Sequence, residues 1–573
     1  MKIAVAQLNP TVGALEANHR RIVDMARQAV AQGAELAVFP EMAICGYPAR
    51  DLVEKPEFVA ESLDWLRRAS CAVPALTLIC GCATPAPPGS GKSVHNSALV
   101  LENGGVIFQQ SKILLPTYDV FDESRNFAPA AQQRIWRWRG LRIALTICED
   151  AWNDKNYWPQ REQRLLYERD PVEEQMRAGA DFLINISASP YSTGKLELRQ
   201  QMLSAIAREY NVPVVLANQV GGNDQLIFDG GSLLAGPDGT LRARAACFRE
   251  DLLLIDTDSW RGEIRPAPEN EIAAMAQALV LGTRDYVTKC GFERVLLGLS
   301  GGIDSALTAA IAVAALGPDH VQPFYLPSRY SSPASAADAA AVARALGLRL
   351  QTLSIEPLFA AAEAGWCQHW DAAPPAARDL ASQNLQSRLR CLALMALSNL
   401  NGALLLSTGN KSELAMGYCT LYGDMAGGLA VLADVLKTQV YELARYWNRE
   451  REQIPQSVLG KAPTAELKSN QRDQDDLPPY DVLDAVIRLY VEEYRPPESI
   501  AATLQLPPAL VRALIRRMDQ SEYKRQQAAP GLKLSKKAFG MGRRWPIAQR
   551  YEPSLVPGGS LPSELLAAMV EAL

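Results

Sequence analysis

The sequence predicts an α/β protein that is built from two domains. Its 573 residues are too many for a single hydrophobic core, so two or three domains are expected. Residues 1–260 mix hairpins with helices, which indicates two sheets covered by helices. Residues 271–573 alternate strands with helices, which favours a doubly wound parallel sheet. Between them, residues 261–270 contain glycine, two prolines and mixed charges, as is typical of a linker.

Composition excludes several classes of protein. The net charge is −5 and the isoelectric point is about 5.7, so an overall positive charge that would bind nucleic acid is excluded. No uncharged apolar run reaches ~18 residues, and the first residues do not resemble a signal peptide, so neither a membrane span nor export is predicted. Ten scattered cysteines and four histidines without CxxC spacing argue against zinc and predict reduced thiols in a cytoplasmic protein.

Apolar runs and turn residues place the elements of the first domain. We expect strands at 2–8, 35–39, 75–82, 141–148, 181–187, 213–219 and 252–256, helices at 16–33 and 196–210, and hairpins at 97–110 and around 237–239.

Three reactive side chains follow strands in this domain. They are Glu41 in VFPEMAICGYPARDL, Lys112 in SKILLPTYDVFDESRNF and Cys148 in ALTICEDAW. A thiol is mostly protonated at neutral pH, so it needs a base before it can attack a substrate. A carboxylate can take that proton, and a lysine can stabilise the anions that form.

These segments resemble the nitrilase, or carbon–nitrogen hydrolase, superfamily in their chain order, over most of residues 1–260. The resemblance implies an α-β-β-α sandwich that hydrolyses an amide through a thioester on Cys148. Glu41 would be the general base, Lys112 the oxyanion partner and Glu123 a second glutamate that positions the lysine. Positions that contact glutamine in relatives correspond to Tyr118, Ser189 and Lys195.

The second domain is organised around LLGLSGGIDSALTAAI, residues 296–311, which predicts a strand, a glycine turn and a helix start. Adjacent glycines let the backbone approach an anion, and the amides of the helix start point at it. No Gly-Lys-Ser/Thr follows, so this is not a Walker A loop. Asp304 would repel phosphate unless Mg²⁺ lay between them.

Further elements extend the parallel pattern. We expect helices at 271–290, 305–315 and 384–400 and strands at 321–326, 350–355 and 403–407, the last of which ends in TGNKSE. Ligands of open parallel sheets bind at the carboxyl ends of strands, where SGGIDS and STGNKSE both fall.

The glycine loop resembles that of the N-type ATP pyrophosphatases, and the second half resembles NAD synthetases over nearly its whole length. LPSRYSS, NLQSRLR, STGNKSE, YCTLYGD and EYKRQQAAPGLKLS are among the segments that carry this resemblance. It implies a metal site at Asp304 and Glu413, with Mg²⁺ as the cofactor. The implied contacts to ATP are Gly298, Leu299, Ser300, Gly301, Gly302, Ile303, Asp304, Ser305, Thr408 and Lys437, and those to deamido-NAD are Asn384, Glu413 and Lys524. We expect the acidic segment 471–476 to become ordered over the AMP site when ligand binds.

An amide hydrolase joined to an adenylating ligase resembles the glutamine-dependent NAD synthetase family. The implied reaction converts deamido-NAD to NAD with ATP and with ammonia from glutamine, in a homo-oligomer without nucleic-acid or membrane partners. Two alternatives stay open. One is an amidotransferase of the same ATP chemistry that makes GMP or asparagine, although those families usually carry other glutaminase domains. The other is a nucleotide sensor without activity, against which the intact reactive residues argue.

Overall fold

The computed structural model describes residues 1–158, 167–469 and 471–551. The chain divides into two compact units, residues 1–274 and 275–573. The predicted linker, 261–270, lies in the first unit and contains the short strand β15 (Arg261–Gly262). Residues 552–573, at the end of the predicted second domain, lie outside the described residues. In the part of the chain that is described, no helix is both long and apolar enough to cross a membrane.

Two sheets form the centre of the first unit. In the described residues the larger sheet has the order β15, β14 (Asp251–Asp256), β1 (Lys2–Gln7), β2 (Leu36–Val38), β3 (Thr77–Pro85), β4 (Val94–Glu102) and β5 (Gly105–Ser111). The other sheet has the order β13 (Leu241–Arg244), β12 (Leu233–Ala235), β9 (Val214–Asn218), β8 (Phe182–Ser187), β7 (Leu141–Ile147) and β6 (Trp136–Trp138). A hairpin of β10 (Val220–Asn223) and β11 (Leu226–Asp229) accompanies them.

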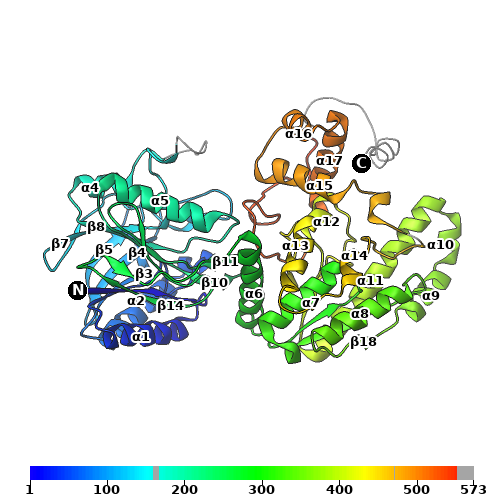
Figure 1. The fold of residues 1–573 in the computed structure, drawn as a ribbon, viewed down its shortest axis with the longest axis horizontal. Helices are drawn as coiled ribbons and strands as arrows, with labels where there is room; N and C mark the ends of the chain where they lie inside the picture. The colour runs from blue at the N-terminus through cyan, green and yellow to red at the C-terminus, as the bar shows by residue number, and fades with distance from the viewer. Residues whose placement is uncertain (159–166, 470, 552–573) are drawn as a thin grey trace. The chain divides into compact units, whose positions relative to one another are not determined.

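Helices cover the outer faces of both sheets. Figure 1 shows α4 (Pro171–Arg177) and α5 (Lys195–Tyr210) at the top of this unit and α1 (Leu15–Ala31) at the bottom, with the strands between them. The helix α2 (Pro56–Cys71) packs against α1 and β3. An apolar cluster that includes Val5 and Leu145 joins the two sheets face to face. The predicted α-β-β-α sandwich is therefore confirmed.

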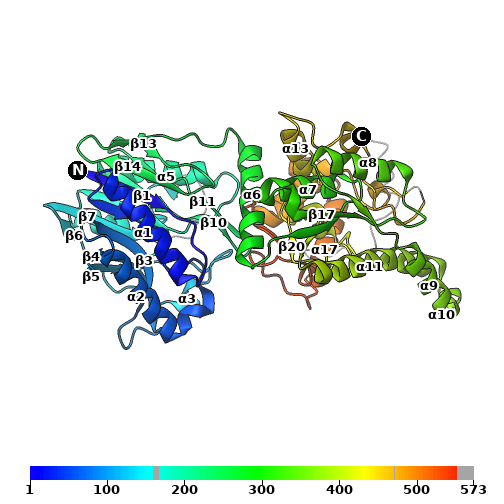
Figure 2. The same ribbon diagram turned by 90° about the horizontal axis from the view of Figure 1, so that it is seen from below.

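The second unit has a five-stranded parallel sheet among its described residues, in the order β18 (Gln351–Thr352), β17 (Val321–Tyr325), β16 (Val295–Gly298), β19 (Leu404–Ser407) and β20 (Leu429–Ala430). Figure 2 shows it between α7 (Ile303–Leu316) and α11 (Pro375–Asn401). Leu394 of α11 packs on Leu296 and Phe324 of the sheet. The predicted doubly wound sheet is confirmed, with helices on both faces.

The other helices of this unit complete its layers and add a helical region. They are α6 (Glu271–Lys289), which begins in the first unit, α8 (Pro333–Ala345), α9 (Glu356–Gly365), α10 (Cys367–Ala372), α12 (Lys411–Met416), α13 (Lys437–Trp447), α14 (Gln456–Gly460), α15 (Tyr480–Ile487), α16 (Pro497–Leu504), α17 (Pro508–Gln520) and α18 (Glu522–Arg525). A separate apolar cluster holds α15, α16 and α17 together. A short α3 (Glu123–Asn126) belongs to the first unit.

Candidate active sites

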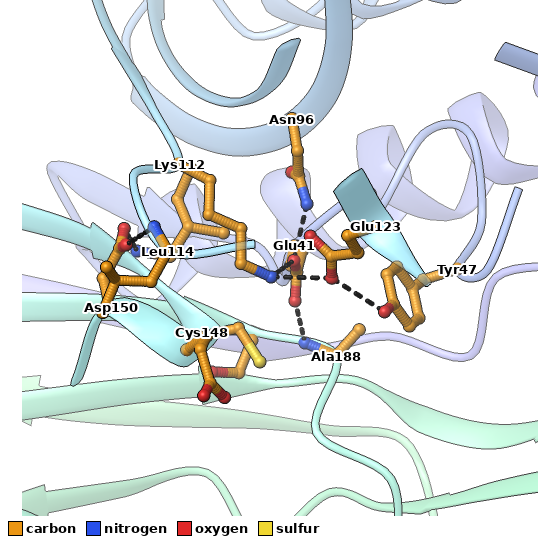
Figure 3. Close-up of polar contacts among 12 residues, drawn as sticks. Glu41, Tyr47, Asn96, Lys112, Leu114, Glu123, Cys148, Asp150 and Ala188 are labelled. Atoms are coloured by element: carbon orange, nitrogen blue, oxygen red, sulfur yellow. Dashed lines mark hydrogen bonds and ion pairs between the residues drawn. The ribbon is translucent and has the colours of Figure 1, made fainter. Parts of the chain in front are cut away.

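Three strand ends of the first unit bring Glu41, Lys112 and Cys148 together. Lys112 directly follows β5, Cys148 directly follows β7, and Glu41 lies three residues after β2. The strands belong to the two facing sheets, so their ends converge although the residues are far apart in sequence. Figure 3 shows the Cys148 sulfur lying on the side of the Lys112 amine and the Glu41 carboxylate.

Lys112 is held between two glutamates. Its Nζ donates to Glu41 Oε1 and to Glu123 Oε1, each at 2.8 Å (Figure 3). All three side chains are buried, so the contacts are strong in this low-dielectric surrounding. Burial disfavours the ammonium, but Glu123 and Glu41 outweigh it and raise the pKa of Lys112. Lys112 therefore stays positively charged beside Cys148.

The pKa of Glu123 is higher than that of an ordinary glutamate. Burial raises its pKa to about 7, although Lys112 opposes that shift. Its Oε1 also accepts a hydrogen bond from the Tyr47 hydroxyl at 2.8 Å. Because Lys112 and Tyr47 both donate to this one oxygen, the carboxyl group is held in place and can orient the lysine.

The orientation of Glu41 depends on two groups that the sequence did not identify. The Asn96 side-chain amide donates to Glu41 Oε1 at 2.7 Å, and the backbone N–H of Ala188 donates to Glu41 Oε2 at 2.8 Å (Figure 3). Neither carried a sequence signal, because an asparagine inside a strand and a backbone amide are both commonplace. Together with Lys112 they hold both carboxylate oxygens.

Cys148 is nearly buried and has a backbone conformation that favours a turn. It is 4% exposed, and its φ of 44° lies in the left-handed region, which non-glycine residues rarely adopt. Burial first, and then the charge of Glu41, raises the pKa of the Cys148 thiol well above its ordinary value, while Lys112 opposes the shift. The thiol is therefore protonated at neutral pH and requires a base.

Asp150 fixes the turn that carries Cys148. Its carboxylate accepts backbone hydrogen bonds from Ile113, Leu114 and Ile147, at 3.1, 2.8 and 3.1 Å. The turn after β7 is thus tied to the segment after Lys112. Burial raises the pKa of Asp150 to about 7, against the effect of these donors.

The predicted glutamine contacts all lie in the first unit. The Tyr118 hydroxyl donates to Glu149 Oε2 at 2.8 Å, and this tyrosine is about half exposed. The hydroxyl oxygen of Ser189 is buried and has no hydrogen-bond partner among the described residues. Lys195 begins α5, with its Nζ 5.5 Å from the centre of the Trp152 ring. An unpartnered hydroxyl and a cation suit a polar substrate.

In the second unit the SGGIDS loop connects β16 to α7. Gly301 has φ of 81°, and a Cβ there would lie 2.3 Å from the Ser335 carbonyl oxygen, so only glycine fits. The hydroxyls of Ser300 and Ser305 lie 3.1 Å apart, and Ser300 Oγ accepts from the Gly302 N–H. These contacts fix a tight turn at the start of α7.

Two carboxylates share one lysine beside this loop. Lys437 Nζ contacts Asp304 Oδ2 and lies 3.5 Å from Glu413 Oε1. Asn410 donates to Asp304 Oδ1 at 2.9 Å and also caps α12, which carries Glu413. Burial raises the pKa of Glu413 to about 8, with Lys437 opposing and Asp304 reinforcing the shift.

A cavity of about 860 Å³ opens over the carboxyl ends of β16 and β19. Of the residues predicted for ATP and deamido-NAD, it is lined by Gly298, Leu299, Ser300, Gly302, Ile303, Asp304, Ser305, Thr408, Lys437, Asn384, Glu413 and Lys524. Gly301 lies in the loop itself. Thr420 donates to Asn384 Oδ1 at 2.7 Å, and Lys524 Nζ donates to the carbonyls of Gly417 and Cys419.

The segment 461–468 also lines this cavity, although no motif in the sequence predicts it. Glu466 accepts hydrogen bonds from the hydroxyls of Ser332 and Ser335, at 2.8 and 2.6 Å. The acidic segment 471–476 contributes Gln471, Asp473 and Asp476 to the lining. Its expected ordering on ligand binding stays a prediction.

Comparison with known proteins gives matches over both units. A family model described as carbon–nitrogen hydrolase matches residues 2–265, and one described as NAD synthase matches residues 275–528. A glutamine-dependent NAD(+) synthetase of Synechocystis sp. is 48% identical, over 96% of this chain and 99% of its own. The chain belongs to the glutamine-dependent NAD(+) synthetase family. ATP is a substrate in this family.

Other members of the family agree in length and in fold. The glutamine-dependent NAD(+) synthetase of Acinetobacter baylyi is 40% identical, over 96% of this chain and 99% of its own. The solved structure of the Acinetobacter baumannii enzyme, in complex with ADP, is 37% identical, with a TM-score of 0.74 over 95% of this chain and 98% of its own. A solved structure from Cytophaga hutchinsonii, 21% identical, shares the fold with a TM-score of 0.80 over 99% of each chain.

Proposed function

We propose that this chain amidates deamido-NAD to NAD, using ATP and ammonia released from glutamine and giving AMP, pyrophosphate and glutamate. The observation that carries the proposal is the presence of two separate reactive sites in one chain of this family. One is a buried thiol beside a carboxylate and a lysine, and the other is a cavity beside a glycine loop and paired carboxylates. The alternative of a GMP- or asparagine-forming amidotransferase is not favoured by the names of the relatives.

In the first unit we assign glutamine hydrolysis to Cys148. Glu41 takes the thiol proton, and the sulfur attacks the side-chain amide carbon of glutamine. The amine of Lys112 donates to the oxyanion that forms, and Glu123 keeps the lysine in place. The proton on Glu41 then goes to the departing nitrogen, so ammonia leaves and a thioester remains. Water, deprotonated by Glu41, cleaves the thioester to glutamate and restores the thiol. Tyr118, Ser189 and Lys195 bind glutamine.

In the second unit we assign adenylation to the cavity over β16 and β19. The nicotinate carboxylate of deamido-NAD attacks the α-phosphate of ATP, and pyrophosphate leaves toward the N–H groups of the SGGIDS loop. Ammonia then attacks the acyl carbon, and AMP leaves. Lys437 and Thr408 bind ATP, and Asn384, Glu413 and Lys524 face deamido-NAD. Because ammonium is no nucleophile, a protein that makes ammonia from glutamine gains a usable nitrogen source.

The carboxylates Asp304 and Glu413 fit a Mg²⁺ ion. They are hard oxygen donors beside the glycine loop, which is the donor type that Mg²⁺ prefers. No group of three or more metal-binding side chains occurs among the described residues, so phosphate oxygens and water would complete the coordination. When bound, Mg²⁺ neutralises the charge of the phosphates. The same two side chains contact Lys437, and Glu413, whose pKa is raised to about 8, would release its proton when the ion binds.

We further propose the domain limits, the location and the assembly of the protein. Residues 1–260 form the glutaminase domain, 261–270 the linker and 271–573 the synthetase domain with its C-terminal extension. A cytoplasmic location is supported by the thiols of the buried cysteines Cys45, Cys80, Cys82 and Cys148, which form no disulfide. A homo-oligomer is supported by exposed apolar side chains on α11, where Leu392 and Leu400 are 60% and 79% exposed.

The test is NAD synthesis by the purified protein. Deamido-NAD, ATP, Mg²⁺ and glutamine should together yield NAD, AMP and glutamate, and omission of any one substrate should stop NAD formation. Parallel reactions with xanthosine monophosphate or aspartate in place of deamido-NAD test the alternative. AMP release with either of these substrates but not with deamido-NAD would overturn the proposal.

A further inference from the structure

A buried ion pair in the first unit belongs to neither set of assigned residues. Arg199 Nη2 donates to Asp229 Oδ2 at 2.8 Å, and the two side chains are 1% and 0% exposed. Burying two charges is costly even when they pair, and an apolar pair of similar volume often stabilises a fold as well. The ion pair therefore calls for an explanation other than stability.

The pair connects to the glutamine site through Asn218. Asn218 Nδ2 donates to the Gly230 carbonyl at 2.8 Å and lies 3.5 Å from Asp229 Oδ1, while Arg199 Nη2 reaches the same carbonyl at 3.3 Å. The other end of the Asn218 amide, Oδ1, accepts the backbone N–H of Ser189 at 3.0 Å. Asp229 and Gly230 thus fix which way this amide faces, and the amide fixes Ser189.

The segment held in this way also contacts the proposed base. Ala188, the residue before Ser189, donates its backbone N–H to Glu41 Oε2. A displacement of Ser189 would therefore move the donor that orients Glu41 as well. One short segment after β8 therefore carries Ser189, the proposed glutamine contact, and the backbone amide that orients Glu41, the proposed base.

The arginine end of the pair acts on another glutamine contact. Lys195 and Arg199 are four residues apart in α5, so they lie on one face of the helix, one turn from each other. Arg199 fixes this face to β11, which carries Asp229. The first turn of α5, which carries Lys195, is therefore anchored to β11, and Asn218 contacts the end of the same strand.

We propose that Arg199 and Asp229 are a positioning pair for the glutamine subsite. The pair holds Ser189 and Lys195 at the spacing that glutamine requires and, through Ala188, keeps Glu41 oriented toward Cys148. Neither residue touches the reacting atoms. This inference rests on the proposed glutaminase function of the first unit.

The pair is vulnerable to loss of either partner. Arg199 Nε and Nη1 have no hydrogen-bond partner in the part of the chain that is described, so the guanidinium is held through Nη2 alone, by Asp229 and the Gly230 carbonyl. Asp229→Asn would leave a buried cation without a counter-ion and is expected to lower both stability and activity. A second variant must therefore separate the two effects.

The double variant Arg199→Met/Asp229→Leu makes this separation. It replaces both charges with apolar groups, which restores much of the stability that a single substitution removes. It does not restore the contact of Asn218 with Asp229, or the contact of Arg199 with the Gly230 carbonyl that Asn218 also binds. We therefore expect its KM for glutamine to rise at least about tenfold and its kcat for glutamate release to fall, because small displacements of reacting groups are costly. Its kcat for NAD synthesis from ammonium chloride should equal that of the wild type.

The matched control is Ile22→Ala on α1, which creates a cavity against the outer face of the other sheet. It should lower the melting temperature and leave the KM for glutamine unchanged. A wild-type KM for glutamine in the double variant would overturn the positioning role. An equal rise of KM in Ile22→Ala would show that any loss of stability has this effect and would overturn it too. Absence of glutaminase activity in the wild type would overturn the proposed function itself.

Discussion

The environment of Cys148 determines how the proposed hydrolysis of glutamine begins. Its thiol is nearly buried, and burial and Glu41 hold its pKa well above the ordinary value. A neutral thiol beside a carboxylate can pass its proton directly when a substrate arrives. Lys112 remains charged between Glu41 and Glu123, and in the proposed reaction it would supply the positive charge that the oxyanion needs. The proposed chemistry therefore depends on proton transfer between Cys148 and Glu41, two side chains that are almost inaccessible to solvent.

Cys148→Ala should abolish NAD synthesis from glutamine and leave synthesis from ammonium salts intact. The expected loss with glutamine is at least about 10³-fold, because removal of a nucleophile leaves only binding and oxyanion stabilisation. The measurement is NAD formation with each nitrogen source in turn. Equal losses with both sources, in a variant with a wild-type melting curve, would contradict the assignment of separate sites.

The reactivity of Cys148 should increase with pH well beyond the range of an ordinary thiol. Its raised pKa means that the thiolate fraction still grows above pH 9. The measurement is the rate of alkylation by iodoacetamide, followed at Cys148 by peptide mass spectrometry. The exposed Cys71 provides an internal control. A rate at Cys148 that levels off below pH 8 would show a preformed thiolate and contradict the proposed role of Glu41.

Residues with distinctive chemistry could be predicted from the sequence, whereas those that act through ordinary contacts could not. Glu41, Lys112 and Cys148 were identifiable because each follows a strand within a family motif. Asn96 and Ala188 complete the hydrogen bonds of Glu41, but nothing distinguishes an asparagine in β4 or a backbone amide after β8. Such partners become visible only when the two sheets are packed.

Among the elements, the turn between β16 and α7 has little freedom to change. Gly301→Ala would place a Cβ 2.3 Å from the Ser335 carbonyl oxygen at a φ of 81°. Because the loop must shift, we expect NAD synthesis to fall about 10²-fold with either nitrogen source, as for other small displacements of binding groups. Glutamate release from glutamine should persist. Both activities are measured on the same preparation.

The matched control for Gly301 lies at the other end of α7. Gly317 also has a positive φ, 87°, but a Cβ there has no neighbour within 4 Å among the described residues. Gly317→Ala should therefore leave NAD synthesis close to that of the wild type. If Gly301→Ala retained full synthesis, the loop would not grip the nucleotide as proposed.

The succession of elements followed from the sequence better than their lengths did. The strand expected at 350–355 is reduced to β18, Gln351–Thr352, at the edge of the sheet, where pairing ends early. The helix expected to begin at 384 begins at Pro375. Its extra turns carry exposed side chains such as Leu380, so they lack the apolar period that reveals a packed helix. The helices α15 to α17 were not predicted, and they form a core of their own.

At the scale of the whole molecule, association of copies should depend on the apolar side chains of α11. Leu392→Glu would put a charge on the exposed surface of α11, and we expect it to lower the mass of the particle in solution. The measurement is light scattering coupled to size-exclusion chromatography. Glu61→Lys, on the exposed face of α2, serves as a control and should leave the mass unchanged. An unchanged mass for Leu392→Glu, or a monomeric wild type, would contradict the proposed role of this surface in association.

In the proposed reaction, ammonia that is released from glutamine in the first unit is used in the second. Synthesis is run with glutamine labelled with ¹⁵N in its side-chain amide and with unlabelled ammonium chloride at equal concentration, at pH 7. We predict that most of the NAD formed carries ¹⁵N in its carboxamide, because free ammonium is mostly protonated and does not compete well. The isotope ratio is read by mass spectrometry of the NAD product. NAD that carries the label only in proportion to the labelled ammonia released into solution would contradict the account.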